Sequence, residues 1–253
     1  MKYFEFGKEN KTTLLLLHGV DTTWQMSFEK FIDVAKKKYH IIAVAEDGFN
    51  TDEPDVDAVS VIEEAKKITE YLVENFDGKV DIILGESLGV MIMTEIMLDP
   101  RIKVHTAIGD GYTILEYPNF KFDISKRFFA HLLTEVEFFA FKHMGFFNKI
   151  LGEDIDSMIY KNASKKTLYN LEYSMMPYRY KFEALNLADS YLWHGEKEPG
   201  LKQVLKKIDK SKYHFAHKVF KGKGHGSLLL EPKRLLREVD KAYRGYKGNI
   251  ISS

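Results

Sequence analysis

Two stretches of the chain are apolar at consecutive positions over the length of a β-strand. Leu14 to Leu17 is one, and Ile82 to Leu84 is the other. A strand with one face in water alternates apolar and polar residues, so consecutive apolar residues indicate a strand that is buried on both faces. Such strands occur in parallel sheets that helices cover on both sides. The sequence therefore predicts an α/β fold.

Further strand-length apolar runs alternate with stretches of helical periodicity. One helical stretch follows Ser27, which we expect to be its N-cap, and another extends over about residues 59–72. A third, Leu88 to Leu98, is apolar almost all round and must be buried on most sides. The expected strands are Thr12 to Leu17, Ile41 to Ala45, Val80 to Leu84, Val104 to Ile108, Tyr191 to Trp193 and Lys218 to Phe220.

The alternation stops after Asp110 and resumes near Tyr191. Residues 112–188 are helical in pattern and rich in Phe and Tyr, and no clear buried strand interrupts them. We therefore expect a core of residues 1–111 and 189–253, with an inserted helical cap of residues 112–188. The rings of the cap either pack it onto the core or line a substrate site, and packing is the simpler interpretation. These rings include Phe128, Phe129, Phe138, Phe139, Phe141, Phe146 and Phe147.

Composition argues against several classes of function. The 253 residues carry 37 Lys+Arg against 37 Asp+Glu, and a chain without net positive charge is not expected to bind nucleic acid. The chain has no cysteine, which excludes disulfides, thiolate metal sites and a cysteine nucleophile. No apolar run approaches the roughly 18 residues that span a bilayer, and the N-terminus lacks a signal-peptide core. We expect a cytoplasmic protein with no membrane span, and its oligomeric state stays open.

Residues 85–89 read Gly-Glu-Ser-Leu-Gly and match the pattern G-x-S-x-G. The motif directly follows a predicted buried strand and opens a predicted buried helix, which is the setting of a nucleophile elbow. In such an elbow Ser87 adopts a strained backbone conformation, and side chains at positions 85 and 89 would collide with neighbouring backbone. This context favours a nucleophilic Ser87 over an inert serine in a turn.

A serine hydroxyl needs a base within hydrogen-bond reach. His225 lies in a glycine-rich segment between the last predicted strand and the last predicted helix, where a base can reach the strand ends. His18 also ends a strand, but its neighbour Gly19 favours a role in shaping a turn that presents backbone N–H groups to an oxyanion. We interpret His225 as the base.

The other notable histidines have simpler interpretations. His194 follows a strand and is interpreted as structural. His214 and His217 have a spacing seen among metal ligands, but on a strand that spacing places them on opposite faces. We expect no metal site.

At this point the chain resembles the α/β-hydrolase superfamily, as an esterase-like serine hydrolase with a helical cap. The resemblance rests on four features in the family's order: a strand followed by His18-Gly19, the elbow at Ser87, Gly195 to Glu198 at a strand end, and Gly224-His225. It implies the α/β-hydrolase fold, a mostly parallel central sheet flanked by helices, with the cap inserted.

The resemblance also implies roles for particular residues. Ser87 would be the nucleophile and His225 the general base and acid, while the backbone N–H groups of Val20 and Leu88 would form the oxyanion hole. The family's acid is usually an aspartate in G-x-x-D after the penultimate strand, and here that position is Glu198. The resemblance implies no cofactor.

Two points stay open in this assignment. We favour Glu198 as the acid, with Asp110, which ends the preceding strand, as the alternative, and Glu196 or no acid as a third possibility. Glu86, directly before the nucleophile, either raises the basicity of His225 or points to solvent.

The expected function is hydrolysis of a small to medium acyl ester or thioester through an acyl-enzyme, with a small-molecule acyl substrate. Amide, peptide or C–C bond hydrolysis on the same scaffold is an alternative. So is a hydrolase-like ligand-binding protein without significant turnover. A nucleotide-binding protein is the weakest interpretation, because neither G-x-x-x-x-G-K-[ST] nor a G-x-G-x-x-G after the first strand is present.

Overall fold

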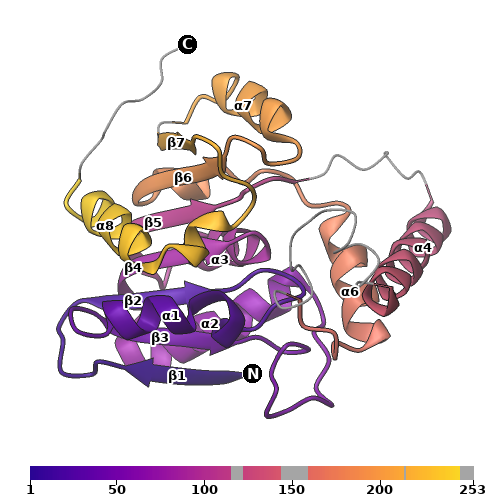
Figure 1. Ribbon diagram of the computed structural model, residues 1–253, viewed down its shortest axis with the longest axis horizontal. Coiled ribbons are helices and arrows are strands. Elements are labelled where there is room, and N and C mark those ends of the chain that lie inside the picture. The colour runs from indigo at the N-terminus through magenta and orange to yellow at the C-terminus, as the bar shows by residue number, and fades with distance from the viewer. Residues whose placement is uncertain (115–121, 144–158, 214, 246–253) are drawn as a thin grey trace.

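The fold is built on a seven-stranded sheet (Figure 1). The computed structural model describes residues 1–114, 122–143, 159–213 and 215–245. The strand order is β1-β3-β2-β4-β5-β6-β7; β1 is antiparallel to β3, and all the other neighbouring pairs are parallel. The strands are β1 (Lys2–Phe6), β2 (Thr13–Leu17), β3 (His40–Ala45), β4 (Lys79–Glu86), β5 (Lys103–Asp110), β6 (Asp189–Gly195) and β7 (Ala216–Phe220).

The six strands expected from the sequence are all present, and the sheet is mostly parallel as predicted. β1 was not predicted. Its five residues are all only partly buried at the edge of the sheet, so they carry little of the apolar signal that marks the central strands.

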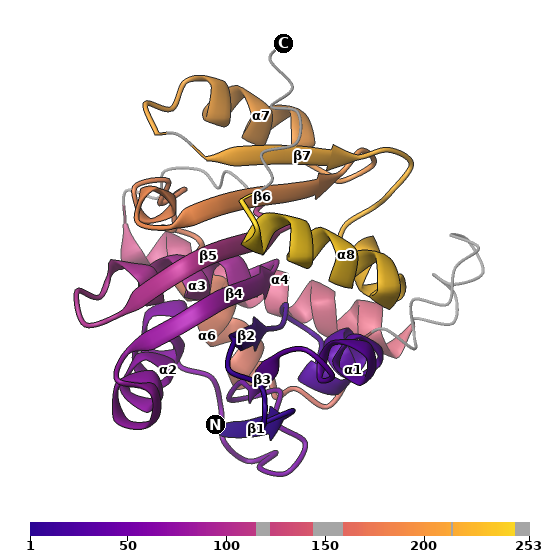
Figure 2. The ribbon, with the colours of Figure 1, turned by 90° about the vertical axis from the view of Figure 1, so that its left-hand side faces the viewer.

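Helices cover both faces of the sheet (Figure 2). Leu14 and Leu16 of β2 pack with α1 (Trp24–Ala35) and α8 (Pro232–Tyr243) on one face. Leu15 and Leu17 pack with helices α2 and α3 on the other face. The four consecutive leucines thus alternate between two buried faces, which is why none of them is polar. The remaining core helices are α2 (Val61–Phe76), α3 (Leu88–Leu98) and α7 (Leu201–Asp209).

The N-cap of α1 differs from the one expected. The helix begins one turn earlier, and Thr23 caps it by accepting a hydrogen bond from the backbone N–H of Met26 at 3.2 Å. Ser27 is a buried residue inside the helix, and the expectation that it is the N-cap was wrong. Trp24, at the first position of the helix, is buried against the sheet, and this packing favours the earlier start.

The chain between β5 and β6 forms helices. Its described residues contain α4 (Asp123–Lys142), α6 (Lys165–Met175) and the short 3₁₀ helix η2 (Ala184–Asn186), and no strand. Figure 1 shows α4 and α6 side by side, on the side of the sheet to which the parallel strands point. None of the helices in the described ranges is both long and apolar enough to cross a bilayer.

The aromatic residues of α4 do not all pack onto the core. Phe138 packs against the core, but Phe128 and Phe139 are 69% and 60% exposed. Of residues 123–140 of α4, the buried ones are small or polar, Ala130 and Thr134. The expectation that the rings serve packing was therefore wrong for Phe128 and Phe139. The side chains of Phe141, Phe146 and Phe147 lie outside the described residues.

Candidate active site

Ser87 lies at a sharp turn between the end of β4 and the start of α3. Its backbone has φ 53° and ψ −111°, a positive φ that is uncommon for a residue with a side chain. A residue held this way stores about 1–3 kcal/mol of strain, and such residues cluster at functional sites. Its backbone N–H donates to the carbonyl of Asp110 at 2.9 Å, which fixes the turn against the end of β5.

Glycine is sterically required on both sides of this turn. A Cβ atom at position 85 would lie 2.5 Å from the carbonyl oxygen of Gly89, and one at position 89 would lie 2.3 Å from that of Leu17. These contacts involve backbone, which cannot move aside without shifting β2 or α3. The G-x-S-x-G pattern is thus explained by the close approach of α3 to the neighbouring strand.

His225 and Glu198 meet at the same edge of the sheet. The Nδ1 atom of His225 lies 2.8 Å from Oε1 of Glu198. His225 follows β7 in a loop, and Glu198 follows β6 three residues beyond Gly195. Gly111, beside the turn of Ser87, is packed so closely against the imidazole that a Cβ there would lie 2.5 Å from its Cε1 atom. The loop after β7 is thereby brought next to the elbow.

Glu198 is positioned by further polar contacts. Its side chain is fully buried, and its Oε2 atom accepts a hydrogen bond from the hydroxyl of Thr113 at 2.8 Å. Burial alone would raise its pKa, but the hydrogen bond with His225 and the nearby histidine charges outweigh burial and lower the pKa below its ordinary value. Glu198 is therefore ionised at neutral pH. The sequence carries no pattern that would have indicated Thr113.

Asp110, the alternative acid, is placed differently. It is 3% exposed, and its Oδ2 atom has no hydrogen-bond partner among the described residues. Burial, together with the charges of Glu86 and Glu198, raises its pKa to about 8. No hydrogen bond joins it to His225 in the described part of the chain. A carboxyl that is mostly protonated at neutral pH is a poor partner for an imidazolium. The third possible acid, Glu196, is exposed and accepts a hydrogen bond from the backbone N–H of Gly222.

Glu86 points into the site and not to solvent. It is 7% exposed, and its Oε1 atom lies 3.4 Å from Nε2 of His225. Burial raises its pKa, and the positive charge of His225 opposes that rise. The imidazole of His225 thus has a carboxylate at each ring nitrogen. Burial lowers the pKa of His225, but Glu198 and Glu86 outweigh this effect and raise the pKa to about 9.

The N–H groups expected to form the oxyanion hole lie at the ends of adjacent strands. Val20 follows β2, and Leu88 is the first residue of α3, so its N–H has no acceptor within the helix. His18 is fully buried, and its Nδ1 atom contacts the carbonyl of Gly19 at 2.8 Å. Burial lowers the pKa of His18 to about 4, so the ring is neutral and acts as part of the turn.

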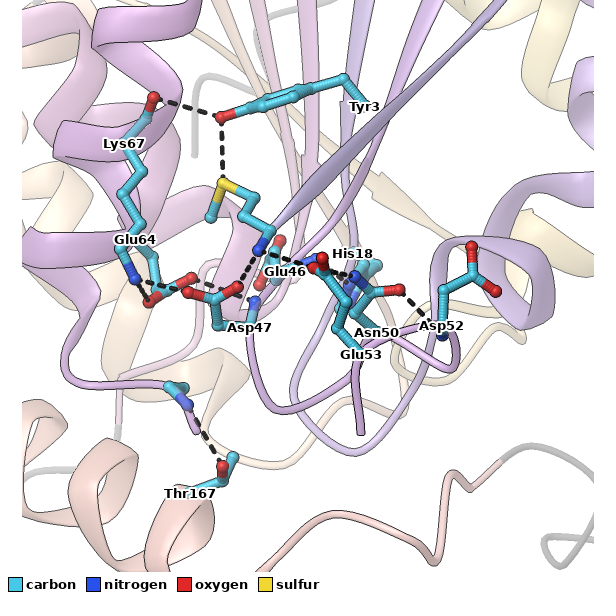
Figure 3. Close-up of polar contacts among 12 residues, drawn as sticks. Tyr3, His18, Glu46, Asp47, Asn50, Asp52, Glu53, Glu64, Lys67 and Thr167 are labelled. Carbon is cyan, nitrogen blue, oxygen red and sulfur yellow. Dashed lines mark hydrogen bonds and ion pairs between the residues drawn. The ribbon is translucent and has the colours of Figure 1, made fainter. Parts of the chain in front are cut away.

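The loop after β3 carries a network of buried polar groups beside His18 (Figure 3). Lys67 of α2 pairs with Asp47 and with Glu64, and the backbone N–H of Asp47 donates to Glu64 at 3.2 Å. Glu46 differs, because neither of its side-chain oxygens has a hydrogen-bond partner among the described residues. Burial, together with the charges of Glu64 and Glu86, raises its pKa well above the ordinary value. This network was not anticipated from the sequence.

A second carboxyl pair connects α4 with the loop after β2. Asp21 follows Val20 with φ 58°, and its carboxyl forms a hydrogen bond with that of Glu137 on α4. Burial and this hydrogen bond raise the pKa of Glu137 to about 10, because the two carboxyls share a proton. The backbone N–H of Tyr160 also donates to the carbonyl of Asp21 at 2.7 Å. The helical segment between β5 and β6 thus contacts the loop that carries Val20.

Two further histidines, His194 and His217, lie next to each other. His194 and His217 contact each other through Nδ1 and Nε2 at 3.1 Å, and burial lowers both pKa values. Within the ranges that the structure covers, no group of three or more His, Asp or Glu side chains is arranged to hold a metal ion. His214 lies outside the described residues.

Comparison with known proteins shows similarity at the level of structure. No protein-family model matches the chain, and no curated protein sequence matches it. An α/β hydrolase family protein from Desulfitobacterium hafniense is 25% identical and has a TM-score of 0.75, covering 95% of this chain and 99% of its own. MenH from S. aureus is 13% identical with a TM-score of 0.71, covering 98% of each chain. A thermophilic esterase from Thermogutta terrifontis is 13% identical with a TM-score of 0.75, covering 98% of this chain and 94% of its own.

These similarities extend over nearly the whole chain, so they concern the complete architecture and not a shared sheet alone. The order of strands, the helices on both faces and the helical segment between β5 and β6 agree with the fold that the sequence predicts. The chain has the α/β-hydrolase fold and belongs to the α/β-hydrolase superfamily.

Proposed function

We propose that this chain is a serine hydrolase that cleaves a small to medium carboxylic ester or thioester through an acyl-enzyme. The observation that carries the proposal is Ser87, held at φ 53° at the start of α3, together with a His225–Glu198 pair whose ring nitrogen and carboxylate lie 2.8 Å apart and whose imidazole lies 3.4 Å from Glu86, the residue before Ser87. A binding protein without turnover has no need of a strained serine beside an oriented imidazole. The esterases and hydrolases among the structural neighbours support the same class of reaction.

Each residue has a defined part in the proposed reaction. The hydroxyl oxygen of Ser87 attacks the acyl carbon while its proton passes to Nε2 of His225. Glu198, on Nδ1, fixes the tautomer of the ring and stabilises the imidazolium that forms. The N–H groups of Val20 and Leu88 donate to the developing oxyanion. Nε2 then protonates the leaving group, and His225 activates the water that hydrolyses the acyl-enzyme.

We also propose that residues 112–188 form a cap over this site. In support, α4 and α6 pack together on the side of the sheet that carries the elbow, and Glu137 of α4 contacts Asp21 beside the proposed oxyanion hole. A cap would select substrates by size, so changes on its inner face should alter acyl-chain preference more than reactivity toward the smallest esters.

The function is tested with p-nitrophenyl acetate, butyrate and octanoate, the matching thioesters, and an anilide series for amides. We expect ester or thioester hydrolysis by the wild type, its loss in Ser87→Ala, and its retention in Ser211→Ala, a control serine beyond α7 that accepts a hydrogen bond from the N–H of Tyr213. Circular dichroism establishes that both variants fold. Equal hydrolysis by wild type and Ser87→Ala, or none by the wild type between pH 6 and roughly pH 10, contradicts the proposal.

A further inference from the structure

The carboxylate of Glu86 lies between two loops that have glycine where they approach it closely. A Cβ at Gly19 would lie 2.2 Å from Oε2 of Glu86, and one at Gly226 would lie 3.2 Å from Oε1. The backbone N–H of Gly19 donates a hydrogen bond to this carboxylate. Glu86 is thus held in a fixed place between the loops after β2 and β7, beside the nucleophile.

The imidazole of His225 lies between two carboxylates. Nδ1 is 2.8 Å from Glu198, and Nε2 is 3.4 Å from Glu86. An ionised carboxylate only accepts hydrogen bonds, so Nδ1 carries the proton of the hydrogen bond with Glu198, and the ion pair with Glu86 forms when the ring is protonated at Nε2 as well. No hydrogen bond between Ser87 and His225 is present in the part of the chain that is described. The nitrogen that must serve Ser87 therefore has another partner in this arrangement.

Among the described residues, the other titratable groups around this pair form no ion pair with His225. Asp110, at the end of β5, has its pKa raised to about 8, so it is mostly neutral at pH 7 and ionised where His225 titrates; burial raises the pKa of Glu46, at the end of β3, well above its ordinary value. His194 of β6 has its pKa lowered by burial and is neutral as well. Glu86 and Glu198 are the two carboxyl groups that contact the imidazole, and the charge of Asp110 adds to their effect on the pKa of His225 without contacting the ring.

We propose that Glu86 is a positioning residue that pairs with Nε2 of His225 in the resting site and withholds this nitrogen from Ser87 until the pair loses a proton. The catalytic consequence rests on the function proposed above, whereas the pair itself does not. The proton leaves for solvent from the side chain of His225, which is 37% exposed. The lone pair on Nε2 then accepts the hydroxyl proton of Ser87 as the Oγ–acyl carbon bond forms, and Glu86 neither gains nor loses a proton in this step.

The first test measures the titration of His225 by NMR and requires no activity. The His225 resonance is assigned by its absence in His225→Gln, and its midpoint is compared in wild type, Glu86→Gln and Glu86→Asp. The wild-type midpoint is expected near the raised pKa of about 9. An opposite charge at this distance changes a pKa by roughly 1–3, so Glu86→Gln should lower the midpoint by about one pH unit or more. Glu86→Asp keeps the charge, so its His225 midpoint should stay closer to that of the wild type.

The second test measures kcat/KM for p-nitrophenyl acetate against pH. Glu86→Gln should move the acidic limb to lower pH by the same amount, so that kcat/KM on that limb rises about tenfold for each pH unit by which the limb moves. A purely structural role would lower the plateau and leave the midpoint of the limb unchanged. The matched control is Glu196→Gln, which removes an exposed carboxylate from the loop after β6 and should leave both midpoints in place.

The outcomes separate this inference from the proposed function. A shifted NMR midpoint without esterase activity at any pH supports the pair and contradicts the function. If the protein is active but Glu86→Gln moves neither the acidic limb of kcat/KM nor the NMR midpoint of His225, the Glu86–His225 pair is overturned and the proposed function stands. If Glu86→Gln does not fold, the wild type decides alone, because a His225 midpoint near the ordinary value of about 6.5 overturns the proposal.

Discussion

Removal of the charge on Glu198 should abolish most of the turnover while leaving substrate binding nearly intact. The carboxylate lies 2.8 Å from Nδ1 of His225 and is fully buried. A unit charge at that distance from an imidazolium is worth about 6 kcal/mol at an effective dielectric constant of 20. Loss of the hydrogen-bond geometry adds to this, because glutamine can present an N–H to Nδ1 and so favour the wrong tautomer.

Part of that energy is offset by the cost of burying Glu198, which raises its pKa against the effect of His225. We therefore expect a loss in kcat of about 10³-fold for Glu198→Gln, equivalent to about 4 kcal/mol, with KM changed only a few-fold. The assay is steady-state hydrolysis of p-nitrophenyl acetate at the pH of highest wild-type activity. Glu196→Gln, in the same loop but exposed, is the matched control and should retain activity within a few-fold.

Asp110→Asn provides the decisive comparison. Asp110 forms no hydrogen bond to His225 among the described residues, so an amide of the same shape should preserve kcat within about tenfold. A several-hundredfold loss in Asp110→Asn, together with near-normal turnover in Glu198→Gln, would refute the reasoning and make Asp110 the acid.

Three further predictions concern stability. The pKa of Asp110 is raised from 3.8 to about 8, so the stability that its protonated carboxyl contributes to the fold is fully present below about pH 4 and is lost as the pH rises to 8. The free energy of unfolding of Asp110→Asn should therefore increase relative to that of the wild type as the pH rises, by up to about 4 kcal/mol at pH 7. Urea unfolding at several pH values measures this, and a difference that does not depend on pH would contradict it. Glu137→Gln should remove the analogous cost of the proton shared with Asp21 and raise the free energy of unfolding near pH 8 by roughly 1 kcal/mol or more; destabilisation at that pH would count against a shared proton. Gly89→Ala would place a Cβ 2.3 Å from the carbonyl of Leu17 and should destabilise the fold by roughly 1–3 kcal/mol in the same assay, so wild-type stability would mean that the contact is relieved cheaply.

The core of the fold could be predicted from sequence because its signals are local and strong. Leu14 to Leu17 and Ile82 to Leu84 are apolar on both faces, and this pattern is incompatible with an exposed strand. The start of α1 was less predictable, since Thr23 and Ser27 are both good N-caps and only the burial of Trp24 against the sheet selects the first. β1 escaped prediction because a partly buried edge strand lacks that apolar signal.

The candidate site likewise has features that the local sequence predicts and features that only the tertiary structure shows. The spacing of the glycines around Ser87 is a local steric requirement, and it was readable from the motif. The direction of Glu86 was not, because it depends on the loops after β2 and β7, which approach from distant parts of the chain. The contact of Thr113 with Glu198 and that of Asp21 with Glu137 likewise arise only from the tertiary arrangement.

The central claim is that Ser87 is the nucleophile, and covalent labelling tests it most directly. Wild-type protein is treated with a fluorophosphonate at pH 9, where His225 is substantially deprotonated, and the adduct is located by peptide mass spectrometry. The account predicts one equivalent of adduct, located at Ser87 and absent from Ser87→Ala. An adduct at another serine, or labelling of Ser87→Ala to the same extent as the wild type, would contradict the account.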